Sequence, residues 1–104
     1  MRRPVAGSVH LRGHAFPIEE LIAFLHWAER HAMRLLVELD HCVEGEEYEE
    51  VLAFYDAGSA LRRWTLWRAA DHLVVEPMTG RIARFSHLHA TLAGLQALRP
   101  HPPG

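Results

Sequence analysis

The sequence predicts an α+β fold, namely an antiparallel β-meander of four or five strands packed on one face by an N-terminal and a C-terminal helix. Three observations support this prediction: a helical apolar period over residues 17–31, short apolar runs separated by turn residues between 62 and 85, and a second helical period after Ser86. An antiparallel sheet needs cover on one face, which two amphipathic helices can provide. We therefore expect a two-layer sandwich.

Composition and length indicate one soluble globular domain, because the chain has 104 residues, 49% apolar and 23% charged. The net charge of −2 does not favour strong non-specific binding to nucleic acid or acidic membranes. No apolar run is long enough for a membrane span or a signal peptide. A single cysteine excludes an intrachain disulfide, so we expect a cytoplasmic protein. The basic residues include no lysine, a composition typical of GC-rich, bacterial genomes.

The two ends of the chain are predicted to lie outside the core. Residues 1–15 contain Gly and Pro without a sustained apolar period and are predicted to form an irregular N-terminal arm. Residues 100–104 are predicted to be a disordered tail, because the prolines in RPHPPG cannot continue a helix. Residues 16–99 are left as the single α+β domain.

The first helix is predicted over residues 17–31. Pro17 occupies a favoured first helical position, and acidic residues follow in the first turn, where the helix dipole favours them. Phe24 and Trp27 widen its apolar face. The residues predicted by their helical spacing to form the buried face are Ile18, Leu21, Ile22, Leu25 and Ala28.

Two segments in the middle of the chain, 34–42 and 48–56, fit either a strand or a helix. For 34–42 a strand is favoured, because a helix continuing from the first one would exceed 25 residues without a break. For 48–56 the run VLAFY favours a strand that ends at the turn Asp56-Ala57-Gly58-Ser59. The helical alternative remains open for both segments.

The second half of the chain is predicted to form three strands and a helix. The strands cover residues 62–68, 72–76 and 81–85, separated by turns at 69–71 and 77–80. Ser86 is the predicted N-cap of the last helix. The leucines expected to face the core are Leu88, Leu92, Leu95 and Leu98.

The stretch RRWTLWR, residues 62–68, combines tryptophans and arginines in a manner that can bind single-stranded nucleic acid. Trp64 and Trp67 are three residues apart, so in a strand they lie on opposite faces. We assign Trp64 and Leu66 to the core, and Trp67, flanked by Arg63, to the outer face. The nucleic-acid hypothesis rests on Arg63, Trp67, Arg81 and Arg84. In the alternative interpretation, the arginines of the meander pair with the acidic run Glu44–Glu50.

A divalent-metal site is a further hypothesis. Adjacent strand residues point to opposite faces, so His41 and Cys42 would need ligands from elsewhere in the fold. His87 and His89 lie two apart at a helix start and are predicted to point in nearly opposite directions. These four residues are the metal-ligand candidates.

The sequence does not predict a catalytic residue or a cofactor, because CxxC, HExxH, GxSxG and Walker motifs are all absent. The leading hypothesis is a non-catalytic interaction module that self-associates as a homodimer. Its basis is a surplus of apolar side chains: the wide face of the first helix, Trp67, and either Phe54 or Leu52. Complementary acidic and basic segments also suit a symmetric interface.

Overall fold

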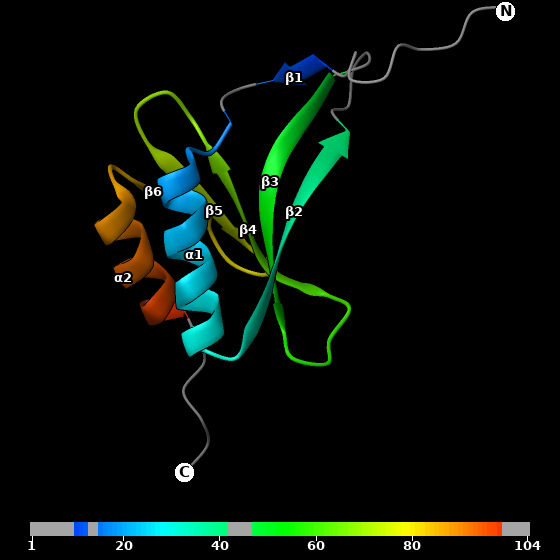
Figure 1. The fold of residues 1–104 in the computed structure, drawn as a ribbon, viewed down its shortest axis with the longest axis vertical. Helices are drawn as coiled ribbons and strands as arrows, with labels where there is room; N and C mark the ends of the chain where they lie inside the picture. The colour runs from blue at the N-terminus through cyan, green and yellow to red at the C-terminus, as the bar shows by residue number, and fades with distance from the viewer. Residues whose placement is uncertain (1–9, 13–14, 42–46, 99–104) are drawn as a thin grey trace, which may run out of the picture.

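The computed structural model describes residues 10–12, 15–41 and 47–98, and these form a sheet with two helices on one face (Figure 1), confirming the predicted α+β fold. Residues 42–46 and the predicted tail 100–104 lie outside the described part. The elements are β1 (His10–Arg12), α1 (Ile18–Arg30), β2 (Met33–His41), β3 (Glu47–Asp56), β4 (Arg62–Arg68), β5 (Leu73–Pro77), β6 (Ala83–Phe85) and α2 (Leu88–Leu98).

The five strands β2 to β6 form an antiparallel meander in sequence order, so the strand interpretation of both ambiguous segments is confirmed. A sixth strand, β1, pairs in parallel with β3 over residues 47–49. The prediction of an irregular arm is therefore wrong at residues 10–12. The physical reason lies in the length of β3, which pairs with β4 only over residues 52–55 and leaves its first residues available on that side.

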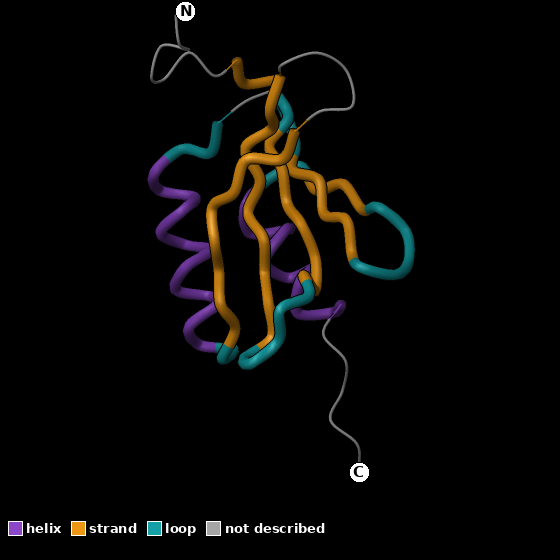
Figure 2. Tube along the Cα trace, turned by 90° about the vertical axis from the view of Figure 1, so that its right-hand side faces the viewer, coloured by secondary structure: helices purple, strands orange, loops and turns teal. Residues whose placement is uncertain are grey.

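The core lies between the sheet and the helices, and Figure 2 shows the strands as one curved layer with the helices behind it. Trp27 of α1 is central to this core, with its ring centroid 6.0 Å from that of Phe54 and 6.2 Å from that of Trp64. Phe54 and Leu52 are fully buried, so the expectation that one of them adds to an exposed surplus is wrong. The other fully buried core residues are Phe24, Leu66, Leu73, Val75 and Leu95, and Ala28 packs with them.

The connection from α1 to β2 is only two residues long, which places the helix directly against the strand that follows it. His31 caps the helix, and Ala32 adopts the left-handed conformation with a φ of 56°. This conformation costs a residue with a Cβ atom roughly 1–2 kcal/mol, and glycine usually occupies it.

The last helix begins one residue later than predicted and has a different N-cap. The Nδ1 atom of His87 accepts a hydrogen bond from the backbone N–H of Ala90 at 3.2 Å, and the His87 carbonyl accepts one from the N–H of Thr91 at 3.0 Å. The imidazole therefore satisfies a free N–H of the first turn, the role predicted for the Ser86 hydroxyl. Ser86 as N-cap is wrong.

Gly94 allows α2 to lie close to β6. A Cβ atom at this position would lie 2.2 Å from Cζ of Phe85, and Phe85 packs against the core. Helix α2 can approach the sheet this closely only because residue 94 has no side chain.

We predict that Gly94→Ala lowers the free energy of unfolding by about 1–3 kcal/mol, because the added methyl group displaces the Phe85 ring. A decrease in the free energy of unfolding is the opposite of the usual effect, since alanine normally stabilises a helix relative to glycine by about 1 kcal/mol. Urea denaturation followed by tryptophan fluorescence measures the change. Gln96→Ala, at an exposed position of the same helix, is the control and should leave stability nearly unchanged. An increase in stability for Gly94→Ala would contradict the close packing.

We predict that Ala32→Gly raises the free energy of unfolding by about 0.5–1 kcal/mol, because glycine adopts the left-handed conformation without a steric penalty. Ala57→Gly, at another exposed position with an ordinary backbone conformation, should have the opposite sign. Thermal unfolding monitored by circular dichroism compares the two variants. A lower melting temperature for Ala32→Gly than for the unmodified chain would show that residue 32 is not left-handed.

Candidate interaction surface

The contacts of α1 with the sheet define which side of the helix remains exposed. Trp27 contacts Trp64 of β4, and the Oε2 atom of Glu20 lies 3.3 Å from Nη2 of Arg68, also on β4. At 100° per residue, Ile18, Ile22 and Leu25 lie roughly 140–180° around the helix from Trp27. These three side chains therefore lie on the side of the helix away from Trp27 and are 66%, 48% and 44% exposed.

Strand β2 continues this apolar region beyond the cover of the helix. Leu35, Val37 and Leu39 alternate onto the face of the sheet that α1 covers. Leu35 packs against the core, but Val37 and Leu39 are 55% and 48% exposed.

We call these five exposed residues the α1–β2 surface: Ile18, Ile22, Leu25, Val37 and Leu39. Because each is about half exposed, together they present on the order of 500 Å² of apolar area, a patch size that is often functional on a soluble protein. The prediction that Ile18, Ile22 and Leu25 belong to the buried face of the first helix is therefore wrong, because Phe24, Trp27 and Ala28 face the core instead.

The edge of β2 is also open to a partner. Within the described ranges, β2 pairs only with β3, so one side of its nine-residue backbone has no strand beside it. The opposite edge, β6, has only three residues. Exposed edges are usually protected by short length, Pro, bulges or charged side chains. Strand β2 is long and has no Pro, and its charged residues are Arg34, Glu38 and Asp40. Leu36 on its outer face is 43% exposed.

A β-bulge at the start of β4 changes the face to which the first arginine points. Tyr55 pairs with Arg62 and Phe54 pairs with Trp64, so Arg63 is an extra residue on β4. The bulge places Arg62 beside Tyr55 on the outer face, whereas strict alternation would have placed it on the helix-covered face with Trp64.

Arg62 organises an ion network on this outer face. Its guanidinium donates hydrogen bonds to Asp40 at 2.9 and 2.8 Å, to Glu38, and to the Thr65 hydroxyl at 3.4 Å. The Tyr55 hydroxyl donates to Glu38 at 2.6 Å. The hydrogen bond from Tyr55, followed by that from Arg62, lowers the pKa of Glu38, and the Arg62 hydrogen bonds lower the pKa of Asp40. The network ties β2 to β4 across β3 and neutralises much of the acidic charge on β2.

The four nucleic-acid candidates do not converge on one surface. Arg63 forms an ion pair with Asp56, roughly 13 Å along the strand from Trp67. Trp67 is half-buried on the outer face, opposite to the buried Trp64, as predicted. Val74 pairs with Trp67 on one side and with Arg84 on the other, so these three residues form one row across the sheet. Arg81 is exposed and lies just before β6. Only Trp67 and Arg84 lie in one cross-strand row, with Val74 between them, and nucleic-acid binding stays a prediction.

The predicted pairing of the meander arginines with the acidic run Glu44–Glu50 is wrong for the three arginines of β4 that form ion pairs in the described structure. Arg62, Arg63 and Arg68 pair instead with acids of β2, β3 and α1. The bulge at Arg63 and the helix above Arg68 bring these other carboxylates closer. Residues 44–46 lie outside the described part.

The metal-ligand candidates are only partly described. His41 ends β2, and Cys42 lies outside the described residues. The His87 and His89 rings are neighbours, with centroids 6.4 Å apart, so the expectation that they point in opposite directions is wrong. The cause is the N-cap, which turns the His87 ring back toward the helix. The described residues contain no group of three or more potential metal ligands.

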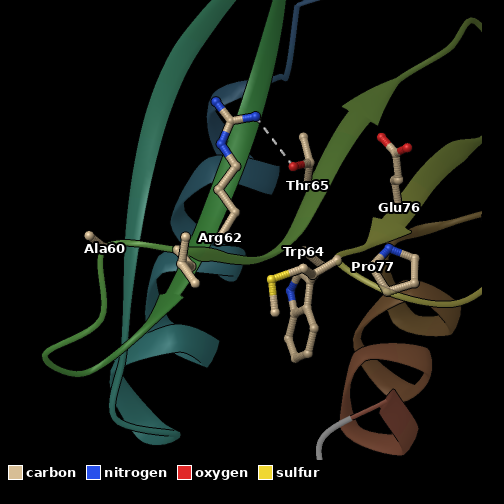
Figure 3. Close-up of a pocket in the computed structure, with 8 residues that line it drawn as sticks. Ala60, Arg62, Trp64, Thr65, Glu76 and Pro77 are labelled. Carbon is tan, nitrogen blue, oxygen red and sulfur yellow. Dashed lines mark hydrogen bonds between the residues drawn. The ribbon is translucent and has the colours of Figure 1, made fainter.

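A shallow pocket of about 380 Å³ lies between the start of β4 and the end of β5 (Figure 3). Arg62, Thr65 and Glu76 project from one side of its wall, while Trp64 and Pro77 lie on the other side. None of the described residues that line it is a serine, cysteine or histidine. Its arginine is already bonded to Glu38 and Asp40, so these groups do not provide a nucleophile with an adjacent base.

The comparisons with known proteins do not identify a relative: no protein-family description, curated protein or solved structure matches this chain. Within the described ranges, neither helix combines the length and apolar content that a membrane-spanning helix needs.

The lowered pKa values of Glu38 and Asp40 predict an acid-dependent contribution to stability. Because the folded-state pKa values are lowered from 4.5 and 3.8, the contribution is complete above these values and is lost as the pH falls through the lower, folded-state values. Arg62→Met removes the cation. The variant should therefore lose less stability than the unmodified chain between about pH 6 and pH 3, by up to about 1 kcal/mol.

Urea unfolding at a series of pH values measures this difference in slope. Arg84→Met is the matched control, because Arg84 is exposed and has no acidic partner in the described structure. It should retain the pH dependence of the unmodified chain. Identical slopes for Arg62→Met and the unmodified chain would show that the network does not contribute.

Proposed function

We propose that the protein is a non-catalytic interaction module that acts as a homodimer, and that its copies meet through the α1–β2 surface. The proposal rests on two features that occur together: five exposed aliphatic side chains, and a nine-residue strand edge without a partner among the described strands. Each feature alone is common, but together they combine apolar area with open backbone hydrogen-bonding groups.

The size of the surface supports an association of two copies. Two patches together offer about 1,000 Å² of apolar area, near the lower bound for a specific interface, before any contribution from the strand edges. Burial of apolar area contributes roughly 25 cal/mol per Å², against which the loss of translational and rotational freedom must be set. A dimer at micromolar concentration is consistent with these magnitudes.

We predict that Ile22→Glu converts the dimer to a monomer, because it places a charge in the centre of the apolar stripe of α1. Ile82→Glu is the matched control. Both residues are exposed isoleucines, at 48% and 45%, but Ile82 lies just before β6, at the opposite edge of the sheet. This variant should remain a dimer.

Sedimentation velocity at about 10–100 μM, a range around the expected dissociation constant, distinguishes the two species. Circular dichroism confirms that both variants are folded. A monomeric unmodified chain at the highest concentration would overturn the proposal, as would dissociation by Ile82→Glu but not by Ile22→Glu.

A further inference from the structure

We infer that the second copy docks by antiparallel pairing of β2 with its own counterpart, which joins the two antiparallel meanders into one continuous sheet with the two α1 helices on the same face. This inference rests on the proposed homodimer and specifies its geometry. The inference rests on β2 itself: when the strand pairs with a second copy of itself, its residues can match in length, in charge and in the face on which each side chain lies.

A two-fold axis restricts the possible registers. The interface is isologous, so each pairing occurs twice, and paired residues must lie on the same face of the joined sheet. The two-fold axis must therefore lie midway between one residue of β2 and the same residue of the other copy. Val37 is the middle residue of β2, and only a register centred there pairs all nine residues, Met33–His41, with the other copy.

The charges of β2 are compatible with this register. A centre at Val37 places Arg34 of each copy opposite Asp40 of the other, so opposite charges face each other. Within its own copy, Arg34 donates to the Ser59 carbonyl and Asp40 is bonded to Arg62, so the register avoids repulsion without requiring a new ion pair. A centre at Glu38 would instead place two glutamates against each other. A centre at Leu36 retains an Arg34–Glu38 pairing but shortens the ladder. Charge and length together favour Val37.

The two faces of the joined sheet differ in this register. On the helix-covered face, Leu35 lies opposite Leu39 and Val37 meets its equivalent, while Met33 lies opposite His41 at the two ends of the ladder. On the outer face, Leu36 lies opposite Glu38. The Glu38 carboxylate is already bonded to Arg62 and Tyr55 of its own copy, so it does not require a partner from the other copy.

The two α1 helices lie on the same face of the joined sheet. Helix α1 is connected to β2 by two residues, and Trp27 reaches Phe54 of β3 and Trp64 of β4, so the helix lies above the strands next to β2. The exposed residues of α1, Ile18, Ile22 and Leu25, add apolar area to the joined molecule.

Disulfide formation tests this register directly. In a Cys42→Ser background, Val37→Cys places two cysteines across the two-fold axis. Residues directly opposite in an antiparallel pair have Cα atoms about 4.5–5.5 Å apart, within the range that a disulfide spans. We expect most of the Val37→Cys protein to form covalent dimers on mild oxidation, as seen by non-reducing electrophoresis. Leu36→Cys and Ala57→Cys are the controls: Leu36 is the centre of the competing register, and Ala57 is an exposed residue just after β3.

A mixing experiment provides a second, independent readout. When Val37 is the centre, residue 35 of one copy lies opposite residue 39 of the other copy. The two substitutions Leu35→Cys and Leu39→Cys therefore meet only when they are on different copies. An equal mixture should therefore form a covalent heterodimer, whereas either variant alone should not. This test does not depend on a substitution at the axis itself.

The outcomes separate the inference from the proposed function. Preferential cross-linking of Leu36→Cys would overturn the Val37 register. If the reduced variants are dimers by sedimentation but neither Val37→Cys nor the mixture cross-links, β2 pairing is overturned while the homodimer remains. If the reduced variants and the Cys42→Ser parent are all monomeric, the homodimer itself is overturned, and the inference with it.

Discussion

The contact of Trp27 with Phe54 and Trp64 determines how the rest of the structure is arranged. It fixes the rotation of α1 about its own axis, because the indole occupies the space above β3 and β4. Glu20 must then face Arg68, and the side of the helix opposite to Trp27, with Ile18, Ile22 and Leu25, stays exposed. The short link through Ala32 adds a second restraint by holding the end of α1 beside the start of β2. The exposed apolar stripe is thus a consequence of core packing.

The sequence was sufficient for the fold class because local patterns and tertiary packing agree along most of the chain. The opposite placement of Trp64 and Trp67 followed from strand alternation alone. Residues 34–42 could not be assigned locally, since their leucines fit both periods, and pairing with β3 decides the matter. Strand β1 has no recognisable local signal. Its three residues form a strand because β3 extends beyond β4, which is a property of the whole sheet.

The candidate surface could be predicted only in part. The apolar width of the first helix was visible in its spacing, but which flank stays exposed depends on the aromatic contacts. Leu36, Val37 and Leu39 put apolar side chains on both faces of β2, a pattern that predicts burial on both faces, but in the structure all three are exposed at the edge of the sheet. The Arg62 network could not be foreseen, since a one-residue bulge reverses the face of that arginine. The role of His87 depended on where α2 begins.

Within the proposed dimer, the Arg62 network explains how an acidic strand can approach a copy of itself. Glu38 and Asp40 project from the outer face of β2, and in a symmetric pairing four such carboxylates would lie near the axis. Their mutual repulsion would oppose association. Arg62 reaches across the sheet to bond both carboxylates of its own chain, so it offsets one of the two negative charges at each edge. The bulge that redirects Arg62 therefore acts on the interface from two strands away: without the extra residue at Arg63, the guanidinium would lie on the other face and the two edges would repel.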